Sequence, residues 1–222
     1  IIYGQLRDIP AKLPLAHALA CTDVVEHIYD PAVFFYDLHV YNSNIISVLT
    51  TASNCDNPFI VNRLQKLQER DEKEGLKDVN AQSGKQHPSF FQMRSEIIKA
   101  NFTDLTQEKI APLATLTRGK NKTDIINLVG SFLNEGEKIE PILHPTNTCD
   151  PFTGSWTERL TTIAEYRKIY HENGFSLSVK NGFYNSWNPS FLKKIISIFI
   201  NNVIKIGGRR LSPFIILVGS RI

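Results

Sequence analysis

The stretch that most constrains the fold is "LAHALACTDVVEHIYDP", residues 15–31, where an apolar run stops abruptly at ionisable side chains. The run carries small or apolar residues on both faces, which is typical of a strand buried in a parallel sheet. Asp23, Glu26 and His27 follow directly, and Asp30-Pro31 is typical of a helix N-cap with Pro at the first helical position. The pattern predicts a buried strand, a polar loop and then a helix.

The remainder of the chain continues this alternation. "IIYGQLRD" at the start and "NIISVLTT" at residues 44–51 each predict a further strand. The closing part is predicted as helix, strand, helix and strand, at residues 157–174, 175–179, 189–205 and 213–220. Strands that alternate with helices indicate an α/β fold.

The middle of the chain has a different pattern, because helical periodicity replaces the strands. We expect helices within 59–75, 89–102, 105–116 and 122–136, with a polar linker between the first two. Residues 58–141 are therefore predicted to form a helical insertion. Residues 1–57 and 142–222 are predicted to form one α/β domain around it.

Composition excludes some classes of protein. The three cysteines, Cys21, Cys55 and Cys149, include no C-x-x-C pair, so we expect reduced thiols and a cytoplasmic protein. The formal charge is only +3, with basic residues scattered among acids, so a nucleic-acid partner is not expected. The longest apolar run, "IISIFINNVIKI", is shorter than the roughly 20 residues that cross a bilayer, so no membrane partner is expected.

Three separated stretches resemble class I S-adenosylmethionine-dependent methyltransferases. "ALACTDVVEHIYDPAVFFYDL" resembles the fourth-strand region of that family, where D-V-x-E-H is followed by D-P and a helix. "YGQLRDIPAKLP" resembles the loop after its third strand. "EYRKIYHENGFSLSVKNGFYN" followed by "LSPFIILVGSR" resembles its closing helix, strand, helix and strand. The resemblance implies a Rossmann-like sheet and methyl transfer from S-adenosylmethionine.

The chain departs from that family at its most diagnostic motif, the Gly-rich G-x-G turn after the first strand. No two of the 12 glycines stand two positions apart. The chain begins Ile1-Ile2-Tyr3 and its one Met is Met93, so we expect an N-terminally incomplete sheet that starts at the third strand. On this interpretation the chain is inactive alone, because the cofactor-binding turn is missing.

The resemblance places four residues at the cofactor. Gln5 occupies the position of an acid that accepts from the adenine amino group, and a Gln carbonyl could accept the same bond. Leu6 would lie beside the adenine ring. Cys21 and Thr22, at the end of the fourth strand, would flank the methionine part of the cofactor.

The resemblance also places Asp23, Glu26 and His27 where methyl donor and acceptor meet. Methyl transfer requires alignment of the acceptor and removal of its proton, for which an imidazole is suited. We therefore predict His27 as the base, with Asp23 as its orienter or as a carboxylate on the acceptor. Relatives with an E-x-x-E-H motif bind a divalent metal, and the Asp23-x-x-Glu26-His27 spacing could suit Mg²⁺ or Mn²⁺, but a metal is the less favoured interpretation. The alternative is that these residues have only structural roles. Asp23 would then cap a turn, Glu26 would be solvated and His27 would satisfy a backbone carbonyl.

Four further residues are candidates for binding the acceptor. His144 lies in a turn-rich loop, Trp156 and Arg159 lie at the expected start of the 157–174 helix, and Tyr184 follows a strand. An exposed Trp and an Arg could hold an aromatic or anionic acceptor. The structural alternatives are a turn residue for His144 and Tyr184, and ordinary core packing for Trp156.

Two functions from different classes remain open. The first is methyl transfer to a small-molecule acceptor. The second is a non-catalytic protein-interaction module that kept part of a methyltransferase fold, for which the missing G-x-G is the best support. A nucleic-acid methyltransferase would need a basic groove or stacking aromatics near Asp23, which the sequence does not indicate. The helical insertion is a candidate surface for oligomers.

Overall fold

The computed structural model describes residues 15–75, 87–187 and 190–222. The predicted first strand and the candidate cofactor residues Gln5 and Leu6 lie outside the described residues. The chain divides into two compact units, Ile1–Asn62 with Leu160–Ile222, and Arg63–Arg159. We call them the sheet unit and the helical unit. The sequence-based boundaries were 57/58 and 141/142, so residues 142–159 lie in the helical unit instead of the α/β domain.

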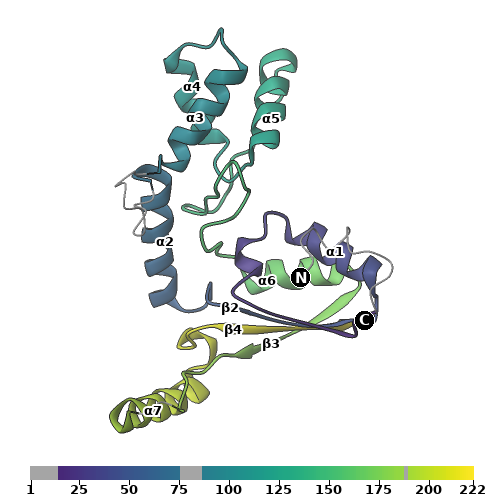
Figure 1. The fold of residues 1–222 in the computed structure, drawn as a ribbon, viewed down its shortest axis with the longest axis vertical. Coiled ribbons are helices and arrows are strands. Elements are labelled where there is room, and N and C mark those ends of the chain that lie inside the picture. The colour runs from purple at the N-terminus through teal and green to yellow at the C-terminus, as the bar shows by residue number, and fades with distance from the viewer. Residues whose placement is uncertain (1–14, 76–86, 188–189) are drawn as a thin grey trace. The chain divides into compact units, whose positions relative to one another are not determined.

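The sheet unit contains one mixed sheet (Figure 1), in the order β1 (Ala18–Thr22), β2 (Ile46–Thr51), β4 (Ile215–Arg221), β3 (Phe175–Asn181). β1 and β2 are parallel, whereas β4 is antiparallel to both β2 and β3. The predicted α/β class is confirmed at this level, and the sheet is compatible with a Rossmann-like fold. Because β4 is reversed, β1, β2 and β3 run in one direction and end at the same edge of the sheet. We call this edge the carboxyl edge.

Two helices cover one face of the sheet. α1 (Pro31–Tyr41) begins where the sequence predicts, since the Asp30 side chain accepts from the backbone N–H groups of Ala32 and Val33. α6 begins only at Ile163 (Ile163–Glu172), because Thr162 and Glu165 form a capping box there, so the expected helix start at residue 157 is wrong. Between these helices and the sheet, Phe35 and Tyr170 pack with ring centroids 4.1 Å apart.

A close approach fixes how α6 sits on the sheet. Gly219 of β4 lies so near the neighbouring side chains that an added Cβ would stand 2.4 Å from Tyr170 Cε1 and 2.4 Å from Ser47 Oγ. Tyr170 itself is completely buried. Only glycine leaves room for the Tyr170 ring at this point of the sheet.

The helical unit contains most of α2 (Pro58–Lys73), which begins in the sheet unit, followed by α3 (Phe90–Asn101), α4 (Gln107–Leu116) and α5 (Lys122–Glu135). As predicted, α5 ends at Gly136, which has a left-handed backbone. The apolar stripes of α3, α4 and α5 meet in one core that includes Ile98, Ile110 and Val129.

Buried polar contacts attach residues 142–159 to α2. The completely buried Gln68 side chain donates to Asn147 Oδ1 and to the carbonyls of Thr157 and Glu158. Arg94 forms a buried ion pair with Glu72, whose carboxylate also accepts from Thr148 Oγ1. Buried polar groups need such partners, and the sequence offers no periodic signal for them. This is why the turn-rich segment joins the helical unit.

The last helix, α7 (Phe191–Gly207), connects β3 to β4 through a short 3-10 turn, Gly208–Arg210. Among the described residues, no helix combines the length and the apolar character needed to cross a membrane.

We expect Gly219→Ala to destabilise the sheet unit by about 1–3 kcal/mol, because the new methyl group overlaps Tyr170 and Ser47. Gly130→Ala in α5 is the matched control, since a Cβ there meets nothing within 4 Å. It should be neutral or stabilise the helical unit by about 0.5–1 kcal/mol. Urea titration followed by circular dichroism checks both. Equal midpoints for Gly219→Ala and the parent protein would contradict the packing described.

Candidate functional site

Polar loops of the sheet unit lie at the carboxyl edge of the sheet. The segments after β1, β2 and β3 leave the sheet here, and β4 enters from the same side. In open α/β sheets, ligands bind outside the carboxyl ends of strands, because loops there can carry polar groups without disturbing the core. The candidate catalytic residues follow β1 at this edge.

Asp23 makes the turn that ends β1. Its backbone is left-handed, with φ of 51°, and its N–H donates to the Thr50 carbonyl of β2 at 3.0 Å. The left-handed region is uncommon for residues other than glycine, although Asp tolerates it better than most. The residue is exposed, so the turn presents Asp23 to solvent immediately beside the end of β2.

Glu26 points the other way, into the protein. Its side chain is buried, and Oε1 accepts from the Ala52 N–H at 3.2 Å. Its charge also acts on Tyr166, whose pKa is raised first by burial and then by the Glu26 carboxylate. Glu26 therefore ties the 3-10 turn Val25–His27 to the loop after β2. This contact is structural. The alternative in which Glu26 is solvated is wrong, because the side chain is buried.

The other β1-end candidates lie closer to solvent than Glu26. His27 is half-buried, and its backbone N–H donates to the Val24 carbonyl at 3.0 Å. Cys21 is half-buried and Thr22 is exposed, and burial raises the pKa of the Cys21 thiol. Within the described part of the chain, no group of three or more His, Cys, Asp or Glu side chains is arranged to hold a metal ion.

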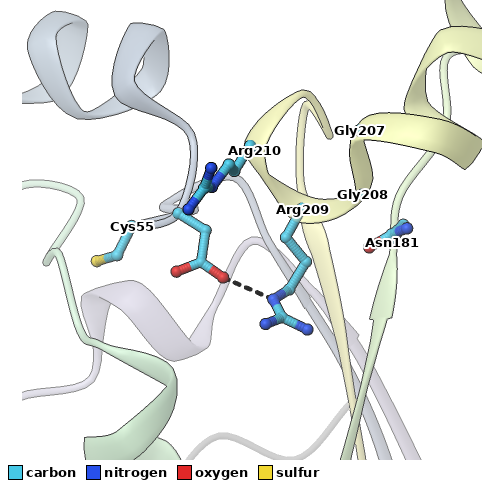
Figure 2. Close-up of a pocket in the computed structure, with 7 residues that line it drawn as sticks. Cys55, Asn181, Gly207, Gly208, Arg209 and Arg210 are labelled. Atoms are coloured by element: carbon cyan, nitrogen blue, oxygen red, sulfur yellow. Dashed lines mark hydrogen bonds and ion pairs between the residues drawn. The ribbon is translucent and has the colours of Figure 1, made fainter.

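A second feature of the carboxyl edge is an open cleft of about 800 Å³ (Figure 2) between the loop after β2, the end of β3 and the turn that precedes β4. Arg209 Nε donates to Asp56 Oδ2 across it at 2.6 Å, which is the dashed line in Figure 2. Its lining residues are Cys55, Asp56, Asn181, Gly207, Gly208, Arg209 and Arg210.

Asparagine side chains next to this cleft join the loop after β2 to the turn that precedes β4. The buried Asn54 Nδ2 donates to the carbonyls of Arg209 and Ser212, at 2.8 and 2.9 Å, and Asn57 Nδ2 donates to the same Ser212 carbonyl at 3.0 Å. Ser212 Oγ in turn donates to the Gly182 carbonyl at 2.8 Å. These residues were not among the sequence-based candidates. The available signal was the polar run "SNCDN" directly after a buried strand.

Cys55 borders the cleft but is a poor nucleophile. Its Sγ donates to the Thr161 carbonyl at 3.2 Å. Burial, followed by the charges of Glu165 and Asp56, raises the pKa of the thiol to about 12. Since the thiolate is the reactive form, Cys55 stays protonated and unreactive at neutral pH.

The four candidate acceptor residues belong to different units. In the helical unit, His144 Nδ1 accepts from the N–H groups of Thr146 and Asn147, which is a turn contact. Trp156 is buried, with the Arg159 guanidinium 4.7 Å from its ring centroid. In the sheet unit, Tyr184 is exposed and follows β3. The exposed Trp considered from the sequence is thus a packed side chain.

No family model, curated protein or solved structure matches the chain.

We expect Cys55 and Cys149 to resist alkylation in the folded protein. Burial is the main cause that raises both pKa values to about 12, so at pH 8 their thiolate fraction is about 1000-fold below that of an ordinary cysteine. Iodoacetamide labelling followed by mass spectrometry measures the rates, and urea-unfolded protein is the control in which all three cysteines react. Rapid labelling of Cys149 in the folded protein would contradict its complete burial.

Proposed function

We propose that the sheet unit is the acceptor-side part of a class I S-adenosylmethionine-dependent methyltransferase domain that acts on a small molecule. The observation that carries the proposal is the position of Asp23 and His27 directly after β1, at the edge where β1, β2 and β3 all end. The reversed last strand β4 lies between β2 and β3, and such an inserted last strand is also a feature of the sheet of that family.

The residues at the end of β1 are compatible with the cofactor the family uses. The side chains of β1 on its more exposed face are small, namely Ala18, Ala20 and Thr22. Cys21 and Thr22 would flank the methionine part, and burial raises the pKa of the Cys21 thiol. When bound, S-adenosylmethionine supplies the methyl group. The sequence contains no G-x-G turn, so these residues account for one side of the cofactor only.

The roles of the three β1-end residues differ. His27 is the proposed base that accepts the proton of the methyl acceptor, and the exposed Asp23 orients the acceptor or the imidazole. Glu26 is a positioning residue, because its bond to the Ala52 N–H holds the turn that carries His27. Tyr184, which is exposed after β3 in the same unit, is the acceptor-binding candidate that this proposal retains.

The test measures binding and turnover separately. Calorimetry measures S-adenosylmethionine binding to this chain and to the chain extended upstream in its reading frame, and formation of S-adenosylhomocysteine with a panel of small-molecule acceptors measures turnover. We expect binding by the extended chain. His27→Ala should leave that binding unchanged and reduce turnover by about 10²- to 10⁴-fold, the usual contribution of a general base.

His171→Ala is the matched control, because His171 is an exposed imidazole on α6, away from the β1 turn in sequence. It should change neither binding nor turnover. Absence of S-adenosylmethionine binding by both chains would overturn the methyltransferase proposal. The non-catalytic interaction module would then be the remaining function.

A further inference from the structure

Helix α7 is attached to the sheet unit by its polar side. Asn201 Nδ2 donates to the Tyr184 carbonyl, and Asn201 Oδ1 accepts from the Tyr184 N–H, both at 2.8 Å. Ile204 lies three residues after Asn201, on the same side of the helix. It is the one completely buried residue that α7 contributes. Lys193, Lys194 and Ser197 lie on this polar side by helical periodicity.

The opposite side of α7 is apolar and faces outward. Its residues recur with helical spacing and their side chains are among the most exposed apolar groups of the described residues. They are Phe191, Leu192, Ile195, Ile196, Phe199, Val203 and Ile206, with exposed fractions from 37% at Val203 to 91% at Ile206. Trp187, shortly before the helix, is also 91% exposed. An exposed apolar side of this length on a helix is a candidate binding surface.

The segment of the chain that carries this surface contains basic residues but no acids. From Phe175 to Ile222 the sequence contains seven basic residues and no Asp or Glu. They are Lys180, Lys193, Lys194, Lys205, Arg209, Arg210 and Arg221. The sequence-based statement that basic residues lie scattered among acids is therefore wrong for this part of the chain. Lys193, Lys194 and Lys205 belong to α7 itself and are exposed, whereas Arg209 is paired with Asp56, so these three lysines make the helix complementary to an anionic partner.

We propose that α7 is an interfacial helix that binds the surface of an anionic lipid membrane. Large apolar and aromatic residues on one side and lysines on the other are the features of helices that lie in the headgroup region without crossing the bilayer. Lysines on the polar side reach the lipid phosphates while the apolar side enters the acyl boundary. The proposal is independent of the methyltransferase proposal, and it concerns only the surface of a bilayer, because no described helix could cross one.

Charge also argues against the alternative occupant, a second copy of the chain. Two α7 helices that packed their apolar sides together would leave Lys193, Lys194 and Lys205 on the outside of the pair, so a dimer would cover the apolar side without neutralising the lysines. An anionic bilayer removes apolar surface from water and neutralises the lysines at the same time.

The test is flotation of the full chain with vesicles of phosphatidylcholine containing phosphatidylglycerol, compared with vesicles of phosphatidylcholine alone. We expect binding to the anionic vesicles that weakens as salt rises. Phe199→Ser with Ile206→Ser should reduce binding at least about tenfold, because both side chains enter the bilayer. Lys193→Glu with Lys194→Glu should reduce it by a similar or larger factor, since each lysine contributes about fivefold near an anionic surface.

Matched controls separate these effects from general loss of apolar surface or charge. Phe59→Ser removes an exposed ring from α2, and Lys99→Glu with Lys109→Glu reverses two exposed lysines of α3 and α4. Neither should reduce binding more than twofold.

Light scattering of the parent protein gives its mass in solution. No flotation with anionic vesicles would overturn the proposal, whether the protein is then a dimer through α7 or a monomer. Equal loss in control and α7 variants would overturn it too.

Discussion

The arrangement of the sheet unit depends on the contact between Tyr170 of α6 and Gly219 of β4. β4 is paired on both sides, so it sits in the middle of the sheet, and the missing side chain at Gly219 admits the Tyr170 ring against the backbone. Phe35 of α1 packs on the same ring, so one tyrosine links the sheet to both covering helices. This packing holds both helices on the sheet whose strands β1, β2 and β3 end together at the carboxyl edge.

Buried polar side chains organise that edge, and of these only Glu26 was among the candidate catalytic residues. Asn54 and Asn57 bind the Ser212 carbonyl, and Glu26 binds the Ala52 N–H, so all three hold the loop after β2 in place. Glu26 of the D-V-V-E-H motif therefore serves as an acceptor for a backbone N–H group. Asp23 and His27 remain the groups of that motif nearer to solvent, and they carry the proposed chemistry.

Local signals predicted helix ends well and long-range contacts poorly. Asp30 caps α1 and Gly136 ends α5 as the sequence indicates, because caps act within a few residues. The start of α6 was wrong by several residues, since the Thr162–Glu165 capping box lies inside the expected helix. The roles of Gln68 and Asn54 were missed altogether, because their partners are far away along the chain and no periodicity reveals them.

Hydrophobic periodicity and capping residues alone were enough to establish an α/β chain with an interposed helical region and an ionisable cluster after a buried strand. Which of those ionisable groups is buried, how β4 is inserted, and where residues 142–159 belong were decided by tertiary contacts. The same holds for α7, whose amphipathic pattern predicts a helix with its apolar side inward. In the structure that side is exposed, and Asn201 on the other side bonds the backbone of Tyr184 in the loop before the helix, a tertiary contact that the amphipathic pattern does not encode.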